Sequence, residues 1–203
     1  MLNITRKPLG MGKERMCYVH PEDPRLAIKI PISKADTQSK REIRFYRQLK
    51  KRGGIEERHI PGFHGLCETN RGRGIVVELV RNHDGEISRP LNWYLAQGFP
   101  IEEFEPYLEE LKQSFLKNLI IFNQDMAIGD ILVRKTAAAR FHMVAIGGLG
   151  DGATFEWPNS IPFLVRRKIR RRWERFITQV YDSREVRLQR EARTRARTRA
   201  AGG

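Results

Sequence analysis

Short apolar runs separated by Gly, Pro and Asp make up most of the first 80 residues of the chain. The clearest runs lie at residues 17–19, 26–30 and 74–80, and runs of this length between turn-forming residues predict strands. Residues 39–50 differ, because their apolar side chains recur mainly at three-residue steps and so predict a helix. The side chains on its apolar face are Ile43, Phe45, Tyr46 and Leu49. We therefore expect a small sheet interrupted by one helix.

Helical spacing becomes dominant after a polar segment at residues 81–90. Residues 101–121 carry apolar side chains at helical spacing behind an acidic start, and carboxylates stabilise helix N-termini. Residues 161–181 show a second helical pattern. Between the two helices, apolar runs at residues 131–133 and 143–146 flank a polar turn and predict a hairpin. The second half of the chain is thus expected to be mainly helical.

These two halves predict an α+β chain made of one domain with two lobes. A length of 203 residues with 40% hydrophobic residues suffices to bury a core. We expect a small mixed lobe with an antiparallel sheet and one helix at residues 1–80, a linker at 81–90, and a mainly helical lobe at 91–183. Residues 184–203 have too little apolar content to pack as core and are predicted to form a flexible basic tail.

The positive charge of the chain is concentrated near its C-terminus. The formal net charge is +14, and residues 161–203 hold 14 Lys and Arg side chains against four acidic ones. An anionic polymer is therefore a candidate partner for residues 166–199. The basic cluster at residues 166–172 has an equally good ordinary explanation, because an amphipathic helix needs a solvated face.

The cellular compartment follows from what the sequence lacks. No apolar stretch reaches the roughly 18–20 residues that a bilayer span needs, and the N-terminus has no apolar core of a secretory signal. The two cysteines, Cys17 and Cys67, are in neither metal-ligand nor redox spacing. We expect a cytoplasmic protein with reduced thiols and no transmembrane segment.

Candidate nucleotide-binding residues lie in the first half of the chain. Gly10 and Gly12 form a turn in which backbone N–H groups can approach phosphates. In residues 26–30, the two-residue period of a strand puts Ala27 and Lys29 on one face. The small side chain of Ala27 leaves room for a flat base, and Lys29 supplies a positive charge for phosphates. Glu42, on the next helix, is the candidate carboxylate that orients Lys29. The ordinary alternatives are a plain turn, an edge-strand Lys and a solvated surface charge.

A second group of candidates follows the first long helix. A polar loop presents Asp125, a second carboxylate follows five positions later at Asp130, and an apolar strand comes next. This is the layout of a kinase catalytic loop, in which Asp125 falls on the catalytic base and Asp130 on the metal-binding Asn. Gly147 stands where the second metal-binding Asp is expected. Asp151, four residues later, is the candidate substitute.

With Lys29, Glu42, Asp125 and Asp130 in this order, the chain resembles the protein-kinase-like superfamily. Several segments are more specifically similar to the PhoP regulatory network protein YrbL family, over about residues 7–180. The segments that carry this similarity are residues 10–21, 27–29, 41–46, 60–65 and 172–177. The resemblance implies a small kinase-like fold with a poorly defined substrate.

Our first hypothesis is a regulatory protein of kinase-like fold that binds a nucleotide, with the backbone of Glu78 and Val80 on the base. If the site is active, it transfers phosphate from ATP with Mg²⁺ held by Asp130 and Asp151, and the acceptor is an unidentified protein or small molecule. The alternative is a non-catalytic pseudokinase scaffold that binds a protein partner or an anionic polymer. Gly147 favours the alternative, since magnesium supplies much of the charge stabilisation in phosphoryl transfer.

Overall fold

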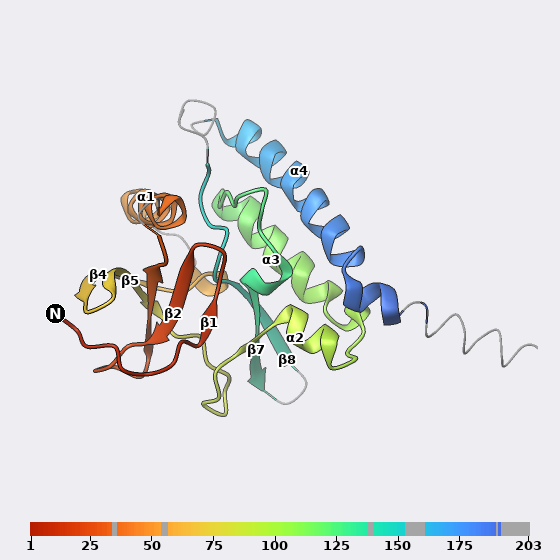
Figure 1. Cartoon of the computed structure of the whole chain (residues 1–203). Helices are drawn as coiled ribbons and strands as arrows, with labels where there is room; N and C mark the ends of the chain where they lie inside the picture. Colours follow the sequence, from red (N-terminus) through yellow and green to blue (C-terminus); the bar gives the residue numbers. More distant parts are fainter. Residues whose placement is uncertain (34–35, 54–56, 138–139, 153–160, 190, 192–203) are drawn as a thin grey trace, which may run out of the picture.

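The computed structural model describes residues 1–33, 36–53, 57–137, 140–152, 161–189 and 191. These residues form a mixed α+β structure with two antiparallel sheets. Figure 1 shows the larger sheet and the first helix on one side of the molecule. The smaller sheet and the remaining helices lie on the other side, which agrees with the predicted change of character along the chain.

The larger sheet has five strands in the order β1-β2-β3-β5-β4, and all neighbours are antiparallel. The strands are β1 Gly10–Met11, β2 Arg15–Val19, β3 Leu26–Pro31, β4 Phe63–Thr69 and β5 Gly72–Glu78. The strands expected from the three apolar runs are present as β2, β3 and β5. Strand β4 has no continuous apolar run because most of its side chains are only partly buried.

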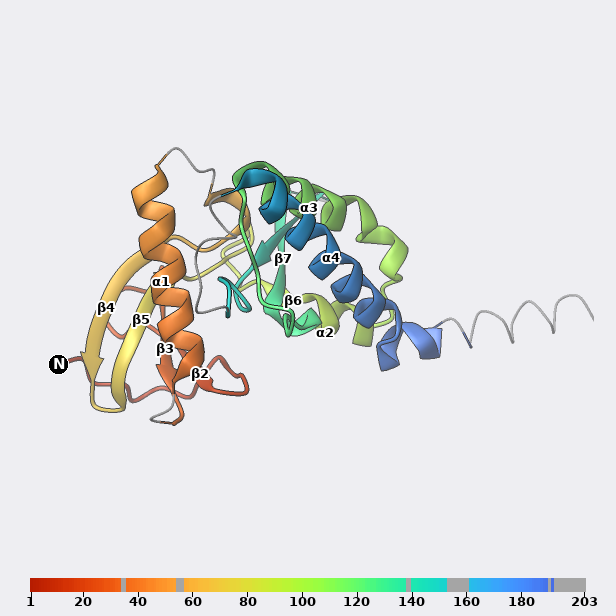
Figure 2. The ribbon, with the colours of Figure 1, turned by 90° about the horizontal axis from the view of Figure 1, so that it is seen from above.

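Helix α1, Thr37–Arg52, lies along one face of this sheet (Figure 2). It includes the whole predicted helix and extends it by two residues at each end. The side chain of Asp36 caps the N-terminus by accepting from the Ser39 amide at 3.2 Å. Glu42 is buried with the apolar face of the helix. The helix therefore presents a carboxylate to the sheet.

The described part of the chain after residue 88 contains the smaller sheet, in the order β6-β7-β8, and the remaining helices. The strands are β6 Arg89–Pro90, β7 Ile131–Ala137 and β8 Arg140–Ala145, and the helices are α2 Leu91–Ala96, α3 Glu105–Asn118 and α4 Pro162–Tyr181. Short 3₁₀ turns are formed by η1 Glu57–His59, η2 Ile101–Glu103 and η3 Ile128–Asp130. The predicted hairpin is present as β7 and β8, with longer strands than expected. None of the described helices, α4 included, combines the length and apolar character that crossing a membrane requires.

The prediction of one helix over residues 101–121 is wrong at both ends. Residues 101–103 form η2, and α3 begins only at Glu105, next to Pro106, whose missing amide suits the first turn of a helix. The helix ends at Asn118 because Leu119 takes a left-handed conformation with φ 51°. Apolar periodicity continues through both breaks, so it could not show them.

Among the described residues, the core has one large part and two smaller ones. The large cluster runs from α1 and the inner face of the larger sheet to β7, β8, α3 and α4. On the outer face of the sheet, Tyr18, Ile28 and Ile30 form a separate cluster with Ile4 and Val76. Strand β3 thus buries Ile28 and Ile30 on one face and turns Ala27 and Lys29 to the other, as its alternation predicts.

The expectation that nothing packs after residue 183 is wrong. Residues 184–189 are helical, and Val186 is 1% exposed within the large core cluster. The side chain of Gln189 donates hydrogen bonds to the carbonyls of Leu95 at 2.8 Å and Phe99 at 3.0 Å. One buried apolar residue, Val186, in a mainly polar segment is enough to dock a helical turn, which an average composition does not reveal. The remainder of the predicted tail, except Glu191, lies outside the described residues.

Removal of residues 184–203 is therefore expected to lower the free energy of unfolding. The loss should be about 1–3 kcal/mol, the value for exposing one buried aliphatic side chain, and should appear as a melting temperature several degrees lower. A chain ending at Glu191 keeps Val186 and Gln189 and is the matched control, expected to melt like the full chain. Equal melting temperatures for all three chains would contradict the docking of Val186.

Candidate functional site

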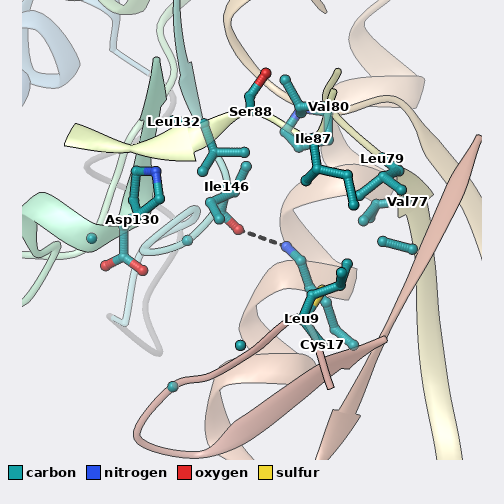
Figure 3. A pocket seen from close by; sticks show the side chains of 18 of the residues that line it. Leu9, Cys17, Val77, Leu79, Val80, Ile87, Ser88, Asp130, Leu132 and Ile146 are labelled. Carbon is teal, nitrogen blue, oxygen red and sulfur yellow. Dashed lines mark hydrogen bonds between the residues drawn. The ribbon is translucent and has the colours of Figure 1, made fainter. Parts of the chain in front are cut away.

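A pocket of about 600 Å³ lies between the larger sheet and the β6–β8 sheet (Figure 3). Its volume is in the range of small-molecule sites. Figure 3 shows apolar side chains on opposite walls, with Leu9, Cys17 and Val77 facing Leu132 and Ile146. Charged side chains also line the pocket, namely Arg15, Lys29, Glu78, Glu86, Arg89 and Asp130. Apolar walls with such charged groups are suited to a flat ring that carries an anionic group.

Lys29 is the charged group that joins the two sides of the pocket. It is 6% exposed, and its Nζ donates to Glu42 Oε1 on α1 at 2.6 Å. The same Nζ donates to the carbonyl oxygen of Ile146, after β8, at 2.6 Å, which is the dashed line in Figure 3. The contact expected between Lys29 and Glu42 is therefore present, and it is buried.

Glu42 binds a second cation that the sequence analysis missed. Arg15 Nη1 lies 2.6 Å from Glu42 Oε2, and Arg15 is 9% exposed. Burial alone would raise the pKa of Glu42, but the charges of Lys29 and Arg15 outweigh burial and hold it below the ordinary value. Lys29, Arg15 and Glu42 together carry a charge of +1, and the carboxyl group of Asp130, which also lines the pocket, offsets this charge when it is ionised. Because Tyr18 packs on the outer face of β2, the two-residue period could have placed Arg15 and Cys17 on the pocket face.

Gly10, Gly12 and Ala27, which are candidate nucleotide-binding residues, all line the pocket. A Cβ atom added to Gly10 would have no neighbour within 4 Å, and one added to Gly12 would meet only the Arg15 carbonyl oxygen at 3.6 Å. Packing therefore does not require glycine at these two positions. Their missing side chains leave the β1–β2 turn open toward whatever fills the pocket.

Glu78 and Val80 also line the pocket, but part of their local backbone is used within the fold. The amide of Glu78 donates to the Gly62 carbonyl, and the amide of Leu79 donates to the Arg25 carbonyl, both at 2.8 Å. The carbonyl of Val80 accepts from the Ser88 amide at 3.1 Å. The amide of Glu78 and the carbonyl of Val80, two backbone groups of the predicted base contact, are therefore already hydrogen-bonded within the fold.

Asp130 lines the pocket beside Gly147, and the two positions are sterically linked. A Cβ atom built on Gly147 would lie 2.1 Å from Asp130 Oδ1 and 2.7 Å from its Cγ. Asp130 Oδ2 accepts from the Ala127 amide at 2.9 Å, which holds the carboxyl group in this position. Burial raises the pKa of Asp130, opposed by the Ala127 hydrogen bond and the charge of Lys29. The side chain of Asp130 thus fills the space that a side chain at position 147 would need.

Gly147→Ala is therefore expected to destabilise the protein. The added methyl group must displace the Asp130 carboxyl group and break its hydrogen bond to Ala127, and overpacking of this kind costs about 1–3 kcal/mol. Asp130→Ala removes the obstructing atoms, so the double variant should recover part of the loss, which urea unfolding of the three variants would measure. Strictly additive losses would show that the two positions do not compete for space.

Three predicted site residues do not line the pocket: Glu42, which is bonded to the lining residues Lys29 and Arg15, and Asp125 and Asp151. Asp125 is exposed on the loop after α3, where it accepts from Asn123 Nδ2 at 3.2 Å. Asp151 is bound by Lys168 and by Arg172 of α4, the latter at 2.8 Å. The structure therefore does not place Asp151 in the pocket with Asp130. Residue spacing suggested that Asp130 and Asp151 hold a metal ion together. The two cations of α4 that form ion pairs with Asp151 come from a later part of the sequence, so the spacing did not reveal them.

Comparison with known proteins gives one family. The family model described as PhoP regulatory network protein YrbL matches residues 4–181 of this chain. The chain is 30% identical over 189 residues to a protein of Escherichia coli (strain K12) named Uncharacterized protein YrbL, with 88% of each chain covered. The protein of the same name from Shigella flexneri matches equally well.

Proposed function

This chain belongs to the PhoP regulatory network protein YrbL family, and from that premise we propose that it is a regulatory protein of kinase-like fold that binds a nucleotide in the pocket beside Lys29. The observation that carries the proposal is the buried contact between Lys29 of β3 and Glu42 of α1 at 2.6 Å. In protein kinases, a strand Lys that holds the phosphates pairs with a Glu on the following helix. A buried ion pair is costly to assemble, so its place at the pocket supports a binding role.

The arrangement of elements supports the kinase-like part of the proposal. A five-stranded antiparallel sheet with one helix lies on one side of the pocket, and a mainly helical half lies on the other. We propose that residues 1–80 form the first lobe, that residues 81–90 form the linker, and that the second lobe runs from residue 91 to 189. The extension beyond 183 rests on the buried Val186.

The charge distribution suggests how the nucleotide lies. Its phosphates face Lys29 and Arg15, the two cations that line the pocket beside Glu42. Its base lies between the apolar walls, where the small side chain of Ala27 leaves room for a ring. The amide of Val80, which follows the end of β5, is the donor that we assign to the base.

We propose that the nucleotide is a ligand and not a phosphoryl donor. Gly147 supplies no carboxylate, Asp125 is exposed outside the pocket lining, and Asp151 is bound to α4. Asp130 is the acidic side chain near Lys29 that remains for Mg²⁺, and its raised pKa makes it a weaker metal ligand. ATP with weak dependence on Mg²⁺ is therefore the ligand that we propose.

A second candidate function rests on the surface of α4. Arg166, Arg167, Arg170 and Arg171 are all exposed on this helix, and Phe163 at its start is 67% exposed. Such a basic face fits the alternative of a scaffold that holds an anionic polymer. The two functions are separable, because these four side chains do not line the pocket.

A thermal-shift titration tests the proposed function. A ligand that binds only the folded state stabilises it by about 2.7 kcal/mol at a hundred times its dissociation constant. ATP should therefore raise the melting temperature by several degrees with or without Mg²⁺. If neither ATP nor another nucleotide moves the transition while an anionic polymer does, the scaffold function replaces the nucleotide-binding one.

A further inference from the structure

Two histidines and a glutamate lie close together away from the nucleotide pocket. His59 comes from η1, Glu110 from α3 and His142 from β8. One ring nitrogen of each histidine and a carboxylate oxygen of Glu110 all lie within 4.8 Å of one another. None of the three lines the pocket beside Lys29. Elements distant in the sequence therefore bring three potential metal ligands to one place.

Hydrogen bonds to backbone carbonyls orient both imidazole rings. His59 Nδ1 lies 2.9 Å from the Met143 carbonyl oxygen, and His142 Nε2 lies 2.8 Å from that of Arg58. A carbonyl oxygen only accepts, so each of these ring nitrogens carries the hydrogen. In the neutral ring the lone pair is then on the other nitrogen, Nε2 of His59 and Nδ1 of His142. Metal-binding histidines are typically oriented in this way.

The two imidazole rings are buried beside each other. His59 is 4% exposed and His142 is 3% exposed, and their ring centroids are 4.1 Å apart. A histidine binds a metal ion as the neutral ring. The two rings therefore lie close enough together to share one ion with Glu110.

The carboxylate of Glu110 supplies the anionic part of the cluster. Its Oε1 lies 4.0 Å from His59 Nε2, and its side chain is 46% exposed. Arg58 Nη1 is at the same distance from this oxygen but is 60% exposed, and exposed ion pairs contribute little. Because the Glu110 side chain borders solvent, it can rotate toward the rings without disturbing the core.

We propose that His59, His142 and Glu110 bind a Zn²⁺ ion, with solvent in the fourth position. Two imidazoles and one carboxylate form a ligand set that zinc takes in proteins. Ligand atoms in a tetrahedral zinc site lie about 3.3 Å apart, given bond lengths of about 2.0–2.1 Å. The present separations of up to 4.8 Å must therefore contract, and the exposed Glu110 side chain is free to move toward the rings. The ion would join η1, α3 and β8.

Titration of the full chain with ZnCl₂ after treatment with a chelator tests this site. Calorimetry should show one tight site per chain, and the melting temperature should rise as Zn²⁺ is added. Glu110→Gln keeps the shape of an exposed side chain and removes its charge, so the variant should fold and bind Zn²⁺ at least about tenfold more weakly, which is 1.4 kcal/mol. Glu109→Gln, on the same helix with a 53% exposed side chain, is the matched control and should bind like the native chain.

Three results would overturn the proposal. The first is the absence of a saturable zinc site in the native chain. The second is an equal affinity in the Glu110→Gln variant, which would place the ion elsewhere. The third is an equal loss in both glutamine variants, which would show a general effect of charge. Cobalt substitution gives an independent readout, because a four-coordinate site with two imidazoles gives Co²⁺ an intense visible absorption that Glu110→Gln should change.

Discussion

Glu42→Gln is expected to lower the free energy of unfolding by about 3–5 kcal/mol, the cost of breaking a buried ion pair from one side. Glu42 is 1% exposed and is the counter-charge for both Lys29 and Arg15. The variant would leave two cations without their carboxylate in the same buried place. Urea unfolding measures the loss directly, and we expect it to be the largest of any single substitution discussed here.

The pH dependence of this effect has a defined sign. The pKa of Glu42 is held below the ordinary value of 4.5, so its contribution to stability is complete above that pH and is lost as the pH falls through the lower, folded-state value. The stability of the native chain should therefore fall in acid more steeply than that of Glu42→Gln.

Glu68→Gln is the control for Glu42→Gln, because Glu68 pairs with Arg73 at 3.5 Å with both side chains more than half exposed. This variant should lose less than about 1 kcal/mol of stability. Equal losses for the two variants would contradict the buried network.

Lys29→Met is expected to weaken nucleotide binding by about 10–100-fold, because a charged hydrogen bond is worth about 1.5–3 kcal/mol. From the sequence alone this variant would be expected to keep its stability. The structure changes that expectation, since Lys29 is buried and bonded to both Glu42 and Ile146. Affinity must therefore be measured at a temperature where the variant is folded.

Ile28→Val is the matched control for Lys29→Met. Ile28 is the neighbour on β3, is fully buried, and faces the outer cluster away from the pocket. The substitution should cost about 0.5–1.5 kcal/mol of stability without changing nucleotide affinity. If both variants lose affinity to the same degree, general destabilisation explains the loss and Lys29 has no special role.

Local periodicity predicted the parts of the fold that depend on one element at a time. The alternation of residues 26–30 correctly placed Ile28 and Lys29 on opposite faces of β3. The apolar spacing of residues 39–50 correctly predicted α1, and residues 161–181 predicted α4 to within one residue. In each case the pattern is a direct consequence of burying one face.

Apart from the contact between Lys29 and Glu42, contacts between distant segments were not predicted. Arg15 is 27 residues from Glu42, and the two-residue period of β2 can give the face of Arg15 but not its carboxylate partner. Asp151 appeared suitable for a metal until Lys168 and Arg172 of α4 were seen to bind it. Spacing along the chain gives distances only within one element, so the cations that neutralise a carboxylate have to be found in three dimensions.

The histidine cluster shows the same limit. His59 and His142 are 83 residues apart in the sequence, in no motif that would join them. Their rings meet because η1 packs against β8. Each ring is hydrogen-bonded to the carbonyl oxygen of the residue next to the other histidine, His59 to Met143 and His142 to Arg58. Only the folded arrangement identifies them as a pair.

The central claim is that the pocket beside Lys29 binds a nucleotide, and isothermal titration of the native chain with ATP, in buffers with and without Mg²⁺, tests it most directly. We predict that one nucleotide binds per chain in both buffers, with an affinity that Mg²⁺ changes only slightly, because Asp130 is the nearby carboxylate left to hold the ion. The absence of saturable binding in both buffers would contradict the claim, and so would binding that Lys29→Met leaves unchanged.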